Sequence, residues 1–120
     1  MATLSLGPLI LFTPVFEECR HFYEAVLGTE PQSVHDGYAE YRLGSTVFAL
    51  HRSDGPASPA GRLHLHFATS DLNGVLERAT AAGFPPTATP VQQAWGREVH
   101  FTDPAGFGFE IVEMPGEEAV

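Results

Sequence analysis

One order of predicted elements occurs twice along this chain of 120 residues. Each copy consists of a strand, an amphipathic helix and three further strands, and a segment rich in Ser, Gly and Pro at 53–61 separates the copies. Neither copy alone is large enough to bury a stable core. The repeat therefore predicts one α+β domain at 4–113, in which two modules, 4–52 and 62–113, curve their sheets around a shared cleft. The residues that follow, 114–120, are expected to form a loose tail.

Short local signals place the elements of the first module. Thr13-Pro14 predicts a helix N-cap followed by the first helical position, and Gly28 predicts the end of that helix. Asp36-Gly37 predicts a two-residue hairpin turn. The helix has one apolar face, made by Cys19, Phe22, Tyr23 and Val26. The predicted strands of this module are 4–12, 31–35, 38–43 and 46–52.

The second module carries signals of the same kinds. Ser70-Asp71 predicts the start of its helix, and Gly83 predicts the end. The apolar face of this helix is made by Leu72, Val75, Leu76 and Ala79. The predicted strands are 62–69, 89–94, 97–103 and 107–113.

The overall charge limits the partners of the protein. The formal net charge is −9, from 15 acidic and 6 basic residues, which argues against nucleic acid and against anionic membrane surfaces. This acidity would suit a cationic ligand, although it could also act only to keep the protein soluble. The single cysteine, Cys19, excludes an internal disulfide. With no secretory signal pattern and no long apolar run, a cytoplasmic location is predicted.

Alternation along the strands predicts which side chains face away from the helices. Strands place successive side chains on opposite faces, and each helix should cover the more apolar face of its sheet. Glu110 lies mid-strand in FGFEIV, where an unpaired carboxylate would be costly to bury. Alternation places it on the uncovered face, with Glu98 on the preceding strand. Four imidazoles are predicted on the same face: His51, His64, His66 and His100. We therefore expect the Glu110 carboxylate to face imidazole groups.

Four stretches of the sequence resemble one known family. They are FYEAVLG (22–28), YAEYRLGSTVFAL (38–50), HLHFATSDL (64–72) and FTDPAGFGFEI (101–111). They resemble the vicinal oxygen chelate superfamily, which includes glyoxalase I, bleomycin-resistance proteins, fosfomycin-resistance thiol transferases and extradiol dioxygenases. The resemblance implies two βαβββ modules forming a U-shaped mixed sheet. It also implies that pairs of modules, often from two chains, enclose the active site, so a homodimer is expected.

The resemblance also implies where a metal ion would bind. Members of the family take metal ligands from the first and last strands of each module, which here implies His64 and Glu110. The register set by Gly83 favours His64 over His66. The matching positions of the first module are Pro8 and Ala49, which have no ligand atom in their side chains.

Two interpretations of these donors stay open. His51, His66 or His100 could complete a set of two imidazoles and one carboxylate, which suits zinc, iron, nickel or manganese. Alternatively, His64 and Glu110 could hydrogen-bond to each other with no metal ion.

Two functions follow from the sequence. The first is binding of a small organic molecule, cationic ones included, in a cleft at the module or dimer interface. Its contact residues would be Ile10, Phe12, His51, His66, Trp95 and His100. For Trp95, packing in a loop or a dimer is an equal alternative. The second function is a divalent-metal-dependent lyase, isomerase, transferase or dioxygenase reaction of the same superfamily.

Overall fold

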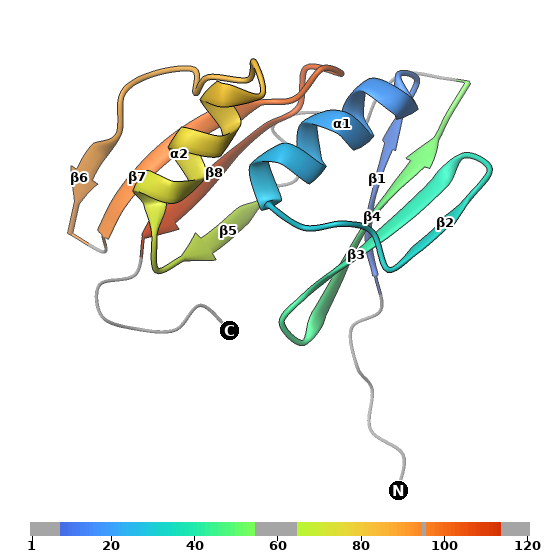
Figure 1. Ribbon diagram of the computed structural model, residues 1–120, viewed down its shortest axis with the longest axis horizontal. Helices are drawn as coiled ribbons and strands as arrows, with labels where there is room; N and C mark the ends of the chain where they lie inside the picture. Colours follow the sequence, from blue (N-terminus) through green and yellow to red (C-terminus); the bar gives the residue numbers. More distant parts are fainter. Residues whose placement is uncertain (1–7, 55–64, 95, 114–120) are drawn as a thin grey trace, which may run out of the picture.

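The computed structural model describes residues 8–54, 65–94 and 96–113, which form two four-stranded sheets with one helix each (Figure 1). The strand order is β1-β4-β3-β2 in the first sheet and β5-β8-β7-β6 in the second. In both sheets the first strand of the module pairs in parallel with its last strand, and the other pairs are antiparallel. The predicted α+β fold of two βαβββ modules is confirmed.

The elements lie close to their predicted positions. Module 1 contains β1 (Leu9–Thr13), α1 (Phe16–Leu27), β2 (Ser33–His35), β3 (Tyr38–Leu43) and β4 (Thr46–Arg52). Module 2 contains β5 (His66–Thr69), α2 (Leu72–Ala81), β6 (Val91–Gln93), β7 (Gly96–Thr102) and β8 (Gly108–Glu113). Neither helix in this part of the chain is long and apolar enough to cross a membrane. Most of the predicted linker, the predicted tail, His64 and Trp95 lie outside the described residues.

The start of α1 differs from the prediction. The N-cap is Val15, which makes no side-chain capping bond, and the helix begins at Phe16 rather than at Pro14. Thr13 is instead the last residue of β1, paired with Arg52. Its hydroxyl accepts the N–H of Val15 at 3.1 Å. The threonine therefore stabilises the turn between strand and helix instead of capping the helix.

The other local signals are confirmed. The Asp71 carboxylate accepts the N–H of Gly74 at 3.0 Å and caps α2. Gly28 ends α1 in the left-handed conformation, at φ 68°. Gly37, at φ 76°, lies in the two-residue turn that joins β2 to β3.

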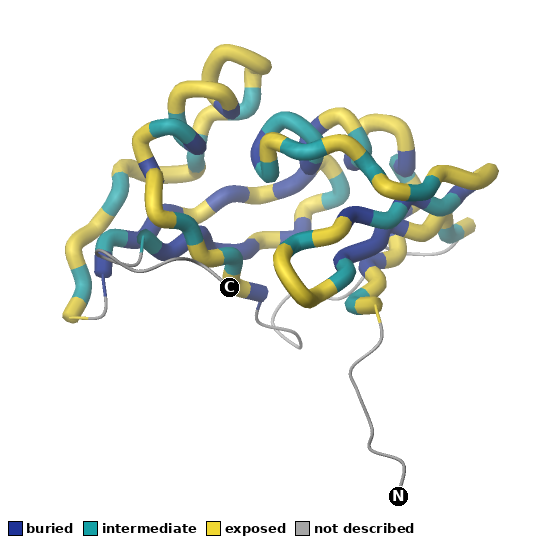
Figure 2. Tube along the Cα trace, turned by 60° about the horizontal axis from the view of Figure 1, so that its bottom comes forward, coloured by how far each residue is buried: buried dark blue, intermediate teal, exposed yellow. Residues whose placement is uncertain are grey.

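One hydrophobic core joins the two modules. Phe109 of β8 stacks on Tyr23 of α1, with ring centroids 5.6 Å apart. Phe67 of β5 packs against Phe48 of β4 with centroids 5.6 Å apart. Figure 2 shows buried segments running through both sheets below the helices. The helix of module 1 therefore packs against strands of both modules.

A buried hydrogen bond adds to this junction. The Tyr23 hydroxyl donates to the Asp103 carboxylate at 2.8 Å, and both side chains are buried. Asp103 also accepts the N–H groups of Ala105 and Phe107, both at 2.9 Å. One carboxylate therefore shapes the β7–β8 turn and ties it to α1.

Alternation along the strands leaves one face of each sheet without a helix. We call this the open face. On β1, Leu11 is 2% exposed, whereas Ile10 is 36% exposed and Phe12 is 46% exposed. On β7, Val99 and Phe101 are buried and His100 is exposed. The predicted separation of core side chains from open-face side chains is confirmed on these strands.

Candidate functional site

Glu110 is the centre of a polar cluster on the open face of module 2. Its Cα pairs with that of His66 on one neighbouring strand and with that of His100 on the other. Its Oε1 lies 2.8 Å from Nε2 of His66, and its Oε2 lies 3.0 Å from Nε2 of His100. Because a carboxylate can only accept hydrogen bonds, the His66 ring donates its Nε2–H to Oε1. The carboxylate is therefore held between two imidazoles.

The cluster has a buried carboxylate and two solvent-accessible imidazoles. Glu110 is only 8% exposed. The side chains of His66 and His100 are 50% and 60% exposed. A ligand above the sheet would thus meet both imidazoles first, with the negative charge beneath them.

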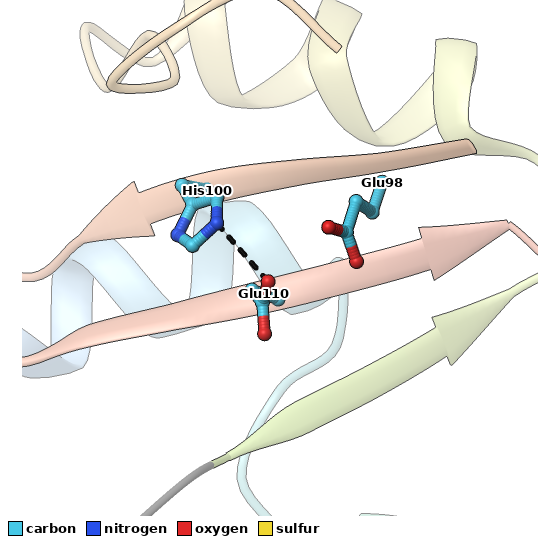
Figure 3. Close-up of side chains that lie close together, drawn as sticks. All are labelled: Glu98, His100 and Glu110. Atoms are coloured by element: carbon cyan, nitrogen blue, oxygen red, sulfur yellow. Dashed lines mark ion pairs between the residues drawn. The ribbon is translucent and has the colours of Figure 1, made fainter. Parts of the chain in front are cut away.

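Glu98 of β7 belongs to the same cluster. It lies two residues before His100 and so shares its face of the strand. Its carboxylate is buried and accepts a hydrogen bond from Gln93 at 3.2 Å. One ligand atom from each of Glu98, His100 and Glu110 lies within 4.8 Å of the others, and Figure 3 shows the three side chains on one side of β7 and β8.

Glu98 is the site residue that the sequence analysis did not select. Alternation places it correctly on the open face. The family resemblance, however, draws attention only to the first and last strands of each module, and β7 is neither. The spacing of Glu98 and His100 in REVHFTD is the signal that could have identified it.

The structure places the other predicted site residues on two different modules. His66 and His100 contact Glu110, whereas Ile10, Phe12 and His51 lie on β1 and β4 of module 1. The His51 ring lies 5.2 Å from the Phe12 ring and 6.0 Å from the Tyr38 ring, between centroids. These rings form a mainly apolar surface on the open face of module 1.

The metal ligands implied by the resemblance are only partly described. Pro8 is exposed and Ala49 is fully buried, and neither offers a ligand atom, so module 1 does not fit the family's ligand pattern. The proximity of His64 to Glu110 stays a prediction, because His64 is outside the described part of the chain. Among the described residues, the structure brings His66 to Glu110.

A cavity of about 410 Å³ lies between the modules. Its lining is mainly apolar, with Leu9 and Phe48 on one side and Phe67 and Ile111 on the other. Glu98, His100 and Glu110 do not line it, but His66 does. Val26 of α1 and Val75 of α2 also line the cavity, so it lies on the helix side of the sheets and shares only His66 with the polar cluster. A cavity of this volume can hold a small organic molecule.

Buried titratable groups outside the cluster show the features of core residues. Burial raises the pKa of the Cys19 thiol to about 11, with the Thr13 hydroxyl opposing the shift. Burial likewise raises the pKa of Asp103, against the hydrogen bonds that it accepts from the turn and from Tyr23. A thiol kept protonated in this way is not a nucleophile at neutral pH.

The fold of two βαβββ modules is that of a known class of protein, and sequence comparison identifies the same class. A family model for the Glyoxalase/Bleomycin resistance protein/Dioxygenase superfamily matches residues 5–111. The chain belongs to this superfamily, as the resemblance of its motifs predicts.

Solved structures support this assignment. The chain is similar to a glyoxalase/bleomycin resistance protein from Catenulispora acidiphila, with 26% identity, a TM-score of 0.74 and coverage of 92% of this chain and 100% of that one. It is also similar to a virulence protein from Salmonella typhimurium, with 26% identity, a TM-score of 0.68 and coverage of 95% and 99%. A lactoylglutathione lyase from Agrobacterium tumefaciens, 18% identical, shares the fold with a TM-score of 0.68 over 94% and 96%. No curated protein matches the chain.

Proposed function

We propose that the protein binds a small organic molecule in a cleft at the module or dimer interface, beside the open face of module 2. The observation that carries this proposal is the nearly buried Glu110 carboxylate between two exposed imidazoles. Such a group offers accessible imidazole rings at the surface and a negative charge below them. Binding pockets commonly combine a few convergent polar groups of this kind with apolar walls.

The ligand that best suits this cluster is cationic. Two buried carboxylates, Glu98 and Glu110, lie on one face of a chain whose net charge is −9. A positively charged group would be attracted to this surface and would relieve the repulsion between the carboxylates. The Catenulispora relative is named a glyoxalase/bleomycin resistance protein.

A homodimer would complete the cleft. Ile10 and Phe12 are exposed apolar side chains on the open face of module 1. A second copy could place this surface opposite the polar cluster of module 2, where Phe12 and His51 would contact the apolar part of a ligand. Trp95 is proposed to stack on the same ligand, and the dimer to act in the cytoplasm.

Calorimetric titration tests the binding proposal. The metal-free protein is titrated, in the presence of EDTA, with bleomycin and with a panel of smaller aromatic amines. Glu110→Gln keeps the shape of the side chain and removes its charge, so it should weaken binding of a cationic ligand at least about tenfold. His21→Ala, at an exposed position on α1, is the matched control and should bind as the wild type does.

Two results would contradict the proposal. One is the absence of binding across the whole panel. The other is equal binding by the wild type and Glu110→Gln, because the ligand would then lie away from the cluster.

A second candidate is a metal-dependent lyase, isomerase, transferase or dioxygenase activity. It is favoured by the carboxylate and imidazole donors that converge on module 2. A bound zinc, iron, nickel or manganese ion would polarise substrate oxygens and stabilise a developing oxyanion. Assays of the superfamily's reactions after loading with each ion test this candidate. Unchanged metal content in His64→Ala and Glu110→Ala would argue against the ligands that the resemblance implies.

A further inference from the structure

We infer that module 2 alone carries a divalent-metal site whose ligands are Glu98, His100 and Glu110. Two neighbouring strands of one module provide all three side chains. The site therefore needs neither His64 nor a residue from module 1 or from a second chain. It uses the same Glu110 carboxylate as the organic ligand proposed above, so the two are tested separately, the organic ligand in EDTA and the ion alone.

The positions of the ligand atoms fit one shared ion. The three atoms lie within 4.8 Å of one another, and Nε2 of His100 is 3.0 Å from Oε2 of Glu110. Ligands that bind one ion at about 2.0–2.2 Å lie roughly 3–4 Å apart, so only small side-chain rotations are needed. Strand geometry explains the convergence, because Glu98 and His100 share a face of β7 and Glu110 lies directly opposite His100 on β8 (Figure 3).

The charges in the cluster also favour a divalent cation. Glu98 and Glu110 are each 8% exposed, so water screens their mutual repulsion poorly. A divalent ion would neutralise both carboxylates together. One imidazole with two carboxylates suits Mn²⁺, Fe²⁺ or Zn²⁺, and the absence of a thiolate from this set disfavours Cu⁺.

His66 acts as a positioning residue for the Glu110 carboxylate. It donates its Nε2–H to Oε1 of Glu110, while Oε2 faces His100. Hydrogen bonds to the second oxygen of a ligating carboxylate orient it, and their loss typically weakens metal binding about 10- to 100-fold. His66 therefore affects affinity without contacting the ion.

Module 1 provides an internal contrast. Glu40, on the open face of β3, accepts hydrogen bonds from Tyr38 at 2.7 Å and Gln32 at 2.6 Å. Within residues 8–54, 65–94 and 96–113, three His, Cys, Asp or Glu ligand atoms converge only at Glu98, His100 and Glu110. The inference is thus specific to module 2.

Metal titration of the EDTA-treated and then dialysed protein tests the inference. Zn²⁺ binding is followed by calorimetry, and Mn²⁺ binding by the electron paramagnetic resonance signal of the free ion. The wild type should bind one ion per chain. Glu98→Gln and His100→Ala should each weaken binding at least about tenfold. His66→Ala should weaken it less than His100→Ala does, and His66→Gln, which restores an N–H donor, should recover part of the loss.

Two controls separate the site from general effects. His21→Ala should bind both ions as the wild type does, since this exposed histidine lies on α1. Circular dichroism confirms that each variant is folded. In the wild type, Mn²⁺ should broaden the NMR signals of the His100 ring more than those of the His51 ring, a readout that needs no variant.

The outcomes distinguish this inference from the proposed function. Absence of binding by the wild type up to millimolar ion would overturn the metal site, while leaving bleomycin binding by the metal-free protein as a separate result. Wild-type affinity in both Glu98→Gln and His100→Ala would also overturn it. The ion would then be held by other residues.

Discussion

The two modules share one fold but carry different chemistry on their open faces. In module 1, the parallel pair of first and last strands brings Ile10 beside Ala49. In module 2, the same pair of strands brings His66 beside Glu110. The backbone arrangement is equivalent, yet one pair is apolar and the other is an imidazole–carboxylate pair. The fold therefore fixes where side chains meet, and residue identity at those positions determines whether they can bind a polar ligand or an ion.

The residues that stabilise the fold are separate from those proposed to bind a ligand or an ion. The residues that join the modules are aromatic rings beneath the helices, whereas the polar cluster lies on the opposite face of the second sheet. Substitutions in these two regions should thus have separable effects. The predictions below test that separation, beginning with the largest expected change in stability.

Phe109→Ala should destabilise the whole domain. Phe109 packs against Tyr23 of α1 and against Phe67 of β5, so its loss opens a cavity where both modules meet. The free energy of unfolding, measured by urea denaturation, should fall by about 3–5 kcal/mol. Phe12→Ala, on the open face of module 1, should cost less than about 1 kcal/mol. Equal losses in the two variants would show that the core does not join the modules as described.

Tyr23→Phe should have the next largest effect. It leaves the buried Asp103 carboxylate without the hydroxyl donor, which should cost about 1–3 kcal/mol. Tyr41→Phe is the matched change within module 1, where the hydroxyl donates to Glu24 at 2.9 Å. Glu24 is partly exposed and can gain water in exchange, so this variant should lose at most about 1 kcal/mol. If Tyr41→Phe lost more free energy of unfolding than Tyr23→Phe, the Tyr23–Asp103 hydrogen bond would not have the stabilising role described for the junction of the modules.

Alkaline pH should weaken the core beneath α1. Burial raises the Cys19 pKa from 9.0 to about 11, so the unfolded chain releases this proton at a lower pH than the folded chain. Stability is therefore fully present below pH 9 and falls as the pH rises from about 9 to 11, with a loss of ~1 kcal/mol at pH 10. Cys19→Ala should make the dependence shallower. Burial also raises the Tyr23 pKa, which acts in the same direction. A melting temperature that rises between pH 8 and pH 10 would contradict this assignment.

Phe12→Ser should have the smallest effect on the stability of the monomer. The side chain is 46% exposed, so the free energy of unfolding at low protein concentration should change by less than about 0.5 kcal/mol. If module 1 contributes to a dimer, the same variant should shift light-scattering mass toward the monomer. A wild-type protein that is monomeric at every concentration would remove the proposed second copy from the cleft.

Most of the fold follows from local sequence patterns. Helix faces, the Asp71 cap and the Asp36-Gly37 turn depend on residues close together in the chain, and all three agree with the structure. The start of α1 does not, because Thr13 continues β1 by pairing with Arg52, a contact that local capping rules cannot include.

The site was only partly predictable for a similar reason. Alternation places His66, His100, Glu98 and Glu110 on one face, since each strand has a fixed side-chain period. Which histidine lies opposite Glu110 depends on the register between β5 and β8, and that register is set by tertiary packing. The structure places His66 there, and the His64 position that the family resemblance favours stays a prediction.

The central claim is that the Glu110 carboxylate lies between two imidazoles on module 2 and accepts a hydrogen bond from His66. Long-range proton–nitrogen NMR correlation of the histidine rings, in EDTA near neutral pH, tests it most directly. The account predicts a proton on Nε2 of His66, and a proton on Nδ1 of His51, whose Nδ1 lies 2.7 Å from the Arg52 carbonyl oxygen. An unprotonated Nε2 in His66 would contradict it.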